Sequence, residues 1–297
     1  MTDRTPADAN VNEPKATAVV TPQNSQSIRR DYNVALEKFD AAVCEASAIS
    51  QAAAGRIAVP HHGYGTHVFT VICGQAIAMI RAAPLSRWIR SDFQNWTPSV
   101  LAGYARAIIE GHLLLAYLME EPESRIAWSA KLNVMHLNDC TRRITLFTNM
   151  EIRDQLEGFR QEAERLKELL RANEYFCSLP VSVQKRCLEG DSAMITTRQE
   201  MLEKVGWDQG HFRALFDLLS QHAHILPLSF YRIEPNGRGT GLENAADQRS
   251  LCTMLEVCTD SLTQCTDLIV NAFPDTSVRR QGKKSKFSPG PRGNLPR

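Results

Sequence analysis

The chain has 297 residues, of which 43% are hydrophobic and 23% are charged, so it can bury the core of one large domain or two small ones. Its formal net charge of +1 excludes a protein that binds nucleic acid or a membrane through its overall charge. The eight scattered cysteines form no C-x-x-C pair, a pattern that favours reduced core thiols over a disulfide framework or a structural metal site.

The N-terminal segment, residues 1–27, is mainly polar and lacks the apolar run of a signal peptide. We therefore expect this segment to be disordered, and the protein to be soluble and cytoplasmic. The most apolar window, residues 68–80, is shorter than the roughly 20 residues that a membrane-spanning helix needs. We expect no membrane contact.

Two amphipathic helices are expected next, over residues 28–54 and about 66–82. Between them, the stretch HHGYGTHV is expected to form a loop. This loop carries three imidazoles whose spacing matches no recognised metal motif: His61, His62 and His67. We therefore expect no metal ion and no other cofactor.

The third helix is predicted to begin with Thr97 as N-cap and Pro98 at the first helical position, where its missing N–H group is not needed. It should end near Glu121, because the next residue is a proline, which disfavours helical geometry in the residue before it. A fourth helix should then run from Pro122 to about Phe147.

Two later segments carry apolar residues at alternating three- and four-residue steps, which is the pattern of a helix with one buried face. These segments are residues 151–173 and about 243–273. Since no convincing period-2 strand pattern occurs, the sequence predicts an all-α fold. The even spread of the helices predicts a single bundle-like domain over residues 28–273.

The C-terminal segment is basic and rich in proline, glycine and serine. Against a single acid, Asp275, it carries seven cations: Arg279, Arg280, Lys283, Lys284, Lys286, Arg292 and Arg297. We expect residues 274–297 to be a disordered tail. It is either a solvated appendage or a segment that binds the phosphates of RNA or DNA.

Two charges interrupt the otherwise apolar stretch 101–119. Arg106 and Glu110 are four residues apart, so a helix places them on one face. Because an isolated buried ion is very costly, these charges need partners. Two interpretations stay open: an internal ion pair that joins two helices, or a polar pocket that faces a ligand.

A second polar face lies on the predicted helix that Pro227 should end. Its members share one side of that helix: Asp217, Ser220, Gln221 and His224. His224 either caps the helix end or acts as an acid–base group beside the Arg106–Glu110 pair. A hydrolase triad of Ser220, His224 and Asp217 is disfavoured, because no nucleophile elbow accompanies the serine.

The segment 123–140 carries further polar residues that could face the same interior: Arg125, His136 and Asp139. His136 and Asp139 are three residues apart and could be metal ligands. A lone H-x-x-D pattern is nevertheless a weak metal signal, so we expect no metal there.

Three stretches, SDFQNWTPSVLAGYARAIIE, YLMEEPESRIAW and LFDLLSQHAHILP, together resemble a functionally uncharacterised family of bacterial all-helical proteins. The resemblance covers about residues 30–270. Members of that family carry R-x-x-x-E on a central helix, then an arginine and an aspartate, then S-x-x-x-H near a later helix end. The matching residues are, in that order, Arg106 and Glu110, Arg125 and Asp139, and Ser220 and His224. The resemblance implies a polar centre shared between helices.

That family is similar to HEPN-type domains, several of which are metal-independent ribonucleases with an R-x(4–6)-H motif. Arg106 and His112 have this spacing, although a regular helix points them about 120° apart. The resemblance implies a ribonuclease or RNA-binding factor with a buried polar centre. We expect Arg106, Glu110 and His224 to meet in one interior pocket as its catalytic residues. The supporting residues would be His112, Arg125, Asp139 and Ser220.

Two other functions stay open. A helical scaffold or homo-oligomer would use the apolar stripes of residues 151–173 and 243–273 as interfaces. A helix-turn-helix DNA binder would use residues 196–219 with Gly206 as its turn. Its core positions would be Met201, Val205, Phe212 and Leu215. The few cations on its second helix suit DNA poorly.

Overall fold

The computed structural model describes residues 22–230 and 238–289, and every statement below concerns those residues. Residues 1–21 and 290–297, in which we expected disorder, lie outside the described residues. Disorder was also expected for residues 22–27, and this is wrong, because they begin a long helix, Pro22–Ala53. The described part of the chain contains helices and no strand, so the predicted all-α fold is confirmed.

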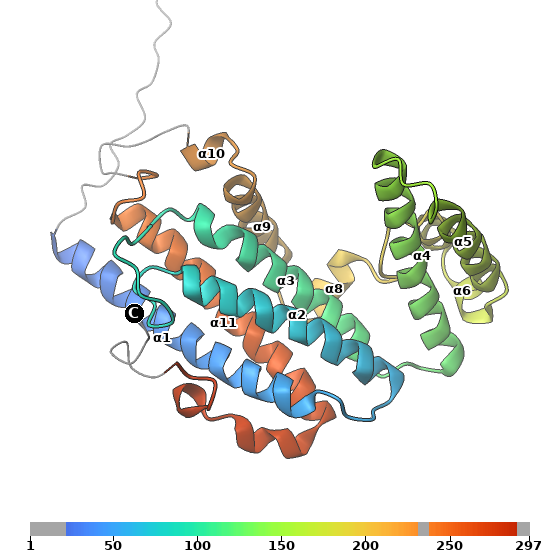
Figure 1. The fold of residues 1–297 in the computed structure, drawn as a ribbon, viewed down its shortest axis with the longest axis horizontal. Helices are drawn as coiled ribbons and strands as arrows, with labels where there is room; N and C mark the ends of the chain where they lie inside the picture. Colours follow the sequence, from blue (N-terminus) through green and yellow to red (C-terminus); the bar gives the residue numbers. More distant parts are fainter. Residues whose placement is uncertain (1–21, 231–237, 290–297) are drawn as a thin grey trace, which may run out of the picture.

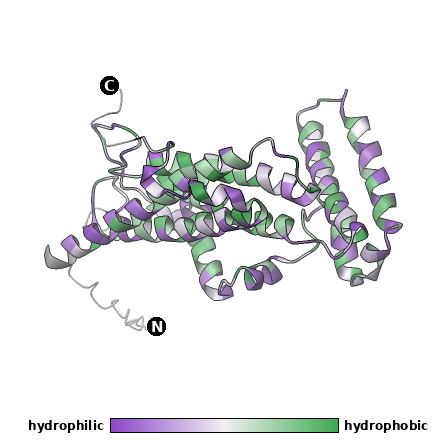
Figure 2. Ribbon diagram, turned by 90° about the horizontal axis from the view of Figure 1, so that it is seen from below, coloured by the Kyte–Doolittle hydropathy of each residue, from purple (hydrophilic) through white to green (hydrophobic). Residues whose placement is uncertain are grey.

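Four long helices lie side by side in a main bundle (Figure 1). They are α1 (Pro22–Ala53), α2 (Pro60–Ala82), α3 (Ser99–Met119) and α11 (Ala245–Ala272). Helix α11 packs against the other three, and α3 packs against α2 and α11. The core holds fully buried large side chains that include Tyr32, Phe39, Phe69 and Tyr117. Figure 2 shows hydrophobic residues gathered toward the middle of this bundle.

Helix α3 is central, as its apolar composition predicts. Its buried residues include Leu101, Ala105, Ile108, Leu115 and Leu118, and they cover most of its circumference. The four-helix bundle therefore leaves only one side of α3 uncovered. The charged residues of α3 lie on this remaining side.

This side of α3 is covered by α8 (Arg198–Lys204) and α9 (Gln209–Ala223), followed by the short helix α10 (Pro227–Phe230). Asp208 caps α9 by accepting a hydrogen bond from the backbone N–H of His211 at 2.8 Å. Gly206 has φ +73° in the turn between α8 and α9, so the predicted turn position is confirmed.

Helices α4 to α7 form a second unit beside the bundle (Figure 1). They are α4 (Arg125–Asn149), α5 (Leu156–Arg171), α6 (Glu174–Ser178) and α7 (Val181–Leu188). This unit has its own cluster of buried residues, which includes Val134, Leu137, Leu166, Leu170 and Phe176. The single helical domain that the sequence predicts therefore contains two hydrophobic cores.

Polar contacts join the second unit to the bundle. Lys131 of α4 donates a hydrogen bond to Glu120 at 2.8 Å, and its ammonium lies 4.8 Å from the ring centroid of Tyr117. The Tyr117 hydroxyl in turn accepts a hydrogen bond from the backbone N–H of Ile195 at 3.2 Å. The residues around Tyr117 therefore connect α3, α4 and the segment before α8.

The apolar stripes on α5 and α11 are used inside the domain. On α5, Ala163, Leu166 and Leu170 are buried in the second core, and on α11, Leu255 and Ile269 are fully buried in the first. The expectation that these two stripes serve as interfaces of a scaffold or oligomer is therefore wrong. Local periodicity shows that a helix face is covered, but it does not show what covers it.

The folded part extends beyond the expected boundary at residue 273. Two 3-10 helices, η1 (Pro274–Arg279) and η2 (Gly282–Lys284), pack against α1. Arg280 pairs with Asp267 of α11 and with Glu45 of α1, and Lys283 lies 3.7 Å from Glu37. Residues 274–289 are therefore not a free basic tail, because carboxylates on α1 and α11 pair with two of its cations, Arg280 and Lys283.

Several helix boundaries also differ from those expected. Helix α2 begins at Pro60, so the stretch HHGYGTHV is helical rather than a loop. Helix α4 begins at Arg125 rather than Pro122, because Ser124 caps it by accepting from the backbone N–H of Ala127 at 3.1 Å. Helix α3 begins at Ser99 without a side-chain cap, so Thr97 does not have its predicted role.

Helix α2 is the one described helix that is long and apolar enough to cross a membrane by length and composition alone. Its most apolar 18-residue window has a mean hydropathy of 1.2. A core helix of a soluble protein passes the same test, and α2 packs against α1, α3 and α11. This finding is weak evidence for a membrane span.

Candidate functional site

Arg106 of α3 holds together a polar cluster that also includes two residues from the end of α9. One guanidinium nitrogen, Nη1, lies 3.1 Å from Ser220 Oγ and 3.1 Å from His224 Nε2. The other, Nη2, lies 3.6 Å from Glu110 Oε1. We call these four residues the Arg106 cluster. The predicted meeting of Arg106, Glu110 and His224 is therefore confirmed, and Ser220 joins them.

The end of α9 places Ser220 and His224 on the same side. Helix α9 ends at Ala223, and His224 is its C-cap residue, whose backbone N–H donates to Ser220 O at 3.0 Å. Ile225 follows with φ +53°, and the backbone N–H of Leu226 donates to Gln221 O at 2.9 Å, which closes the helix end. Helix α9 thus ends shortly before Pro227, close to the predicted position.

The Arg106 cluster lies at the surface, so the predicted interior pocket is wrong. The side chain of Arg106 is 28% exposed, that of Glu110 is 45% exposed, and His224 is exposed. The two charges do not need to be buried because they lie on the one side of α3 that other helices only partly cover. Solvent therefore reaches the groups that could act on a ligand.

The hydrogen bonds define the roles of the polar groups. A guanidinium only donates hydrogen bonds, so His224 Nε2 accepts from Arg106 and the ring proton lies on Nδ1. Ser220 Oγ donates to the carbonyl of Phe216 at 2.7 Å while it accepts from Arg106. The hydroxyl proton of Ser220 is thus directed at the backbone and not at His224. This geometry gives no support to the disfavoured hydrolase triad.

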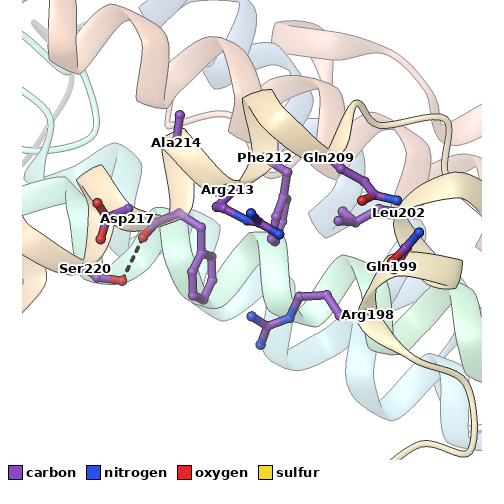
Figure 3. A pocket seen from close by; sticks show the side chains of 10 residues that line it. Arg198, Gln199, Leu202, Gln209, Phe212, Arg213, Ala214, Asp217 and Ser220 are labelled. Carbon is purple, nitrogen blue, oxygen red and sulfur yellow. Dashed lines mark hydrogen bonds between the residues drawn. The ribbon is translucent and has the colours of Figure 1, made fainter.

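A cavity of about 720 Å³ lies between α8 and α9 and reaches the Arg106 cluster at Ser220 (Figure 3). We call it the α8–α9 groove. Its lining residues come from both helices: Arg198, Gln199, Leu202, Gln209, Phe212, Arg213, Ala214, Phe216, Asp217 and Ser220. The groove combines exposed cations with aromatic rings beside the cluster.

The ring of Phe216 links the groove to Arg106. The guanidinium carbon of Arg106 lies 4.4 Å from the centroid of this ring, and that of Arg198 lies 5.0 Å from it. The rings of Phe212 and Phe216 stack with centroids 5.4 Å apart. Sequence reasoning missed Arg198 and Phe216, although both lie in the segment that it assigned to a helix-turn-helix.

His112 does not belong to the Arg106 cluster. It is buried, its ring packs edge-on against Trp207 with centroids 5.8 Å apart, and its Nδ1 has no hydrogen-bond partner. Burial lowers the pKa of His112 to about 4, so the ring is neutral at pH 7. Arg106 and His112 therefore match the R-x(4–6)-H spacing without forming a catalytic pair.

The candidates on α4 do not join the Arg106 cluster either. Asp139 pairs with Arg143 at 2.7 Å on the surface of the second unit, and His136 Nε2 lies 3.3 Å from the Tyr64 hydroxyl. Arg125 is exposed at the first residue of α4, about 21 Å along the helix from Asp139. The expectation that Arg125 and Asp139 support one centre is therefore wrong, because helix length separates them.

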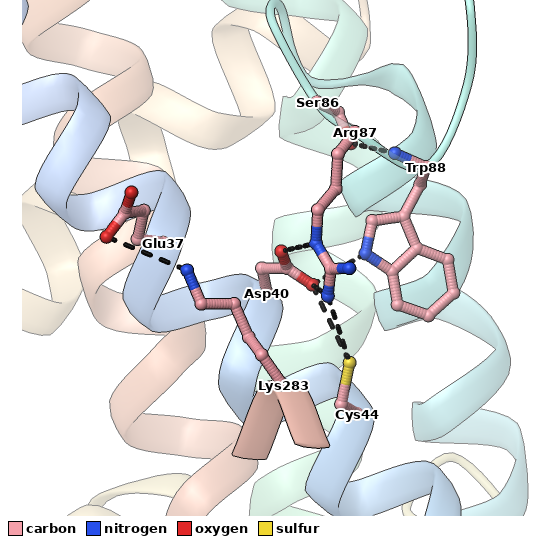
Figure 4. A network of polar contacts seen from close by, with 7 residues as sticks. All are labelled: Glu37, Asp40, Cys44, Ser86, Arg87, Trp88 and Lys283. Atoms are coloured by element: carbon pink, nitrogen blue, oxygen red, sulfur yellow. Dashed lines mark hydrogen bonds and ion pairs between the residues drawn. The ribbon is translucent and has the colours of Figure 1, made fainter. Parts of the chain in front are cut away.

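A buried carboxylate that the sequence analysis missed fastens the loop after α2 to α1 (Figure 4). Asp40 accepts hydrogen bonds from Arg87 Nη2 at 2.9 Å and from Trp88 Nε1 at 2.7 Å. Cys44 Sγ lies 3.6 Å from the same carboxylate, and burial raises the pKa of this thiol to about 11. Cys44 is therefore a protonated structural group and not a nucleophile.

Within the described residues, one group of side chains has the arrangement of metal ligands: His61, His62 and Glu121. It shares no residue with the Arg106 cluster. His136 and Asp139 are not part of such a group.

Comparison of the chain with protein-family models, with curated proteins and with solved structures finds no match in any of the three. The resemblance to the bacterial helical family and to HEPN-type domains therefore stays a prediction that rests on short motifs.

Proposed function

We propose that the α8–α9 groove binds single-stranded RNA and that the Arg106 cluster beside it cleaves the bound strand without a metal ion. The observation that carries this proposal is the position of Arg106. Its guanidinium contacts both His224, which offers a nitrogen lone pair, and the Phe216 ring that lines the groove.

The groove has the chemistry that a single strand requires. Arg198 and Arg213 are exposed along it and offer bidentate donors to phosphate oxygens. Unpaired bases stack on aromatic rings and on guanidinium planes, and the groove offers both. The single acid in the lining, Asp217, leaves these arginines in excess. The groove therefore suits an anionic, partly aromatic ligand.

The cluster supplies a base and a cation for phosphodiester cleavage. When Arg106 turns to a phosphate oxygen, His224 Nε2 is free to take the proton of a ribose 2′-hydroxyl. The 2′-oxygen then attacks the adjacent phosphorus, the bond to the 5′-oxygen breaks, and that oxygen takes a proton from water. The products are a cyclic phosphate and a 5′-hydroxyl end. Arg106 stabilises the charge that develops on the phosphate, and Glu110 orients the guanidinium.

Binding and cleavage are tested separately with a fluorescently labelled single-stranded RNA in buffer that contains EDTA. Arg213→Ala should weaken binding measured by anisotropy and should lower the slope of log Kd against log salt by about 1. Arg160→Ala is the matched control, because it removes the same charge from the exposed face of α5. His224→Ala should keep the affinity and reduce the cleavage rate by at least about 100-fold.

Four outcomes contradict the proposal. If Arg213→Ala and Arg160→Ala bind RNA equally well, the groove is not the binding site. If His224→Ala cleaves at the wild-type rate, the Arg106 cluster is not catalytic. Absence of RNA binding by the wild type favours a scaffold, whereas tighter binding of duplex DNA than of RNA favours the helix-turn-helix function.

A further inference from the structure

Two histidines at the start of α2 and one glutamate after the end of α3 lie close enough to share one ion. His61 and His62 are the second and third residues of α2, and Glu121 follows Met119, where α3 ends, by two residues. One ligand atom from each of His61, His62 and Glu121 lies within 4.8 Å of the others. The group therefore combines two imidazoles and one carboxylate from segments that are about 60 residues apart.

The buried histidine of this group has an unused ring nitrogen that faces the carboxylate. The side chain of His61 is only 6% exposed, and its Nε2 forms no hydrogen bond. This nitrogen nevertheless lies 3.2 Å from Glu121 Oε2. A buried polar atom without a hydrogen-bond partner is costly, so its place beside a carboxylate requires an explanation.

Coordination of an ion explains this geometry better than an ion pair does. Two ligand atoms that bind one Zn²⁺ at about 2.0–2.1 Å lie about 3.3 Å apart and point at the metal rather than at each other. His61 and Glu121 already have this separation without a hydrogen bond. An ion pair would instead direct the ring N–H at the carboxylate oxygen.

Aromatic neighbours hold the two imidazoles. The His61 ring packs edge-on against Trp128 with centroids 5.8 Å apart, and the His62 ring packs edge-on against Phe273 at 5.9 Å. The centroids of the two imidazoles are 4.4 Å apart. Such a hydrophobic shell fixes the ligands and limits solvent access on one side. Solvent reaches the side chains of His62 and Glu121, so both can rotate to close the site.

We propose that His61, His62 and Glu121 bind one divalent transition-metal ion of the zinc class. Imidazole and carboxylate together suit this class, whereas Mg²⁺ and Ca²⁺ prefer oxygen ligands alone. The Glu121 side chain is 84% exposed, so a fourth position faces solvent and takes water or a small ligand. The ion ties the first turn of α2 to the connection between α3 and α4, where the second unit joins the bundle.

The test titrates untagged, full-length protein, freed of metal with EDTA, with ZnCl₂ in a calorimeter. All variants carry Cys177→Ser, because Cys177 is the one exposed cysteine and could bind zinc by itself. We expect one zinc per chain, no competition by excess Mg²⁺, and a higher melting temperature with zinc. His62→Ala and Glu121→Gln should each weaken zinc binding by at least about 100-fold, since even the loss of a group that supports a ligand costs 10–100-fold.

His67→Ala is the matched control, because His67 lies on α2, is exposed and does not belong to the group. Its zinc affinity should equal that of the wild type. His62 and Glu121 are preferred to buried His61 for this test, because their replacement leaves the core intact, which circular dichroism verifies. Absence of a one-to-one site in the wild type, or wild-type affinity in either variant, overturns the proposal. Neither result bears on the RNA proposal, which uses other residues.

Discussion

Replacement of Asp40 by alanine should lower the free energy of unfolding by about 3 kcal/mol. Asp40 is 5% exposed and accepts hydrogen bonds from Arg87 and Trp88 (Figure 4). The variant leaves the Arg87 guanidinium and the Trp88 N–H without this acceptor. Removal of one partner from a buried ion pair costs about 3–5 kcal/mol. We take the lower end of that range, because the Arg87 side chain is 20% exposed and solvent partly replaces the carboxylate.

Urea unfolding followed by circular dichroism at neutral pH measures this loss. With a slope of about 3 kcal/mol/M, the upper end for small proteins, a loss of about 3 kcal/mol moves the midpoint by about 1 M. Asp139→Ala is the control, because Asp139 also pairs with an arginine, at 2.7 Å, but on the surface. Its midpoint should not change, since exposed pairs contribute little.

A loss below about 1 kcal/mol for Asp40→Ala would refute the reasoning. Asp40 would then not fasten the loop after α2 to α1, and the burial of its carboxylate would have no net effect on stability. Equal losses for Asp40→Ala and Asp139→Ala would refute it as well, because the Asp40 carboxylate is buried and that of Asp139 is exposed.

Two further predictions concern the charged and titratable residues of α3. Glu110→Gln should change the free energy of unfolding by less than about 0.5 kcal/mol, because the Glu110 side chain is 45% exposed and lies 3.6 Å from Arg106; a loss of several kcal/mol in urea unfolding would indicate a buried pair. For His112, burial lowers the pKa in the folded protein from 6.5 to about 4, so the unfolded chain binds more protons between these values and stability falls as pH drops through this range. This lowering of the His112 pKa corresponds to a loss of about 3 kcal/mol in the free energy of unfolding between pH 7 and pH 4. Thermal unfolding of His112→Leu should therefore show a smaller loss of stability over this range than that of the wild type. The same pH dependence in both proteins would mean that folding does not lower the pKa of His112.

The sequence was sufficient to predict which residues share one face of a helix and which of these faces are buried. The stripe on α5 and the apolar surface of α3 identify buried faces, since side chains three and four positions apart share one side of a helix. The same repeat puts Arg106 beside Glu110 and Ser220 beside His224. That these two pairs would meet followed from the need of charged groups for partners, and the structure brings them together.

The sequence misled where position along the chain was treated as position in space. Arg125 and Asp139 lie on one helix, but its length separates them, and Asp139 pairs with Arg143 of the same helix rather than with the Arg106 cluster. Exposure of the Arg106 cluster was not predictable, because apolar composition around a helix does not show how far its neighbours extend. Residues 274–289 look unstructured by composition, yet Arg280 and Lys283 meet carboxylates on α1 and α11.

The sequence by itself therefore determined the long helices, their buried faces and the local polar pairs, because contacts between residues three or four apart produce these features. Only the tertiary structure decided which helices meet. The packing of α8 and α9 on α3 forms the groove beside Phe216, and the approach of α2 to the end of α3 brings Glu121 to His61. Contacts between segments so far apart in the chain leave no periodic pattern in the sequence, because they depend on how whole helices pack.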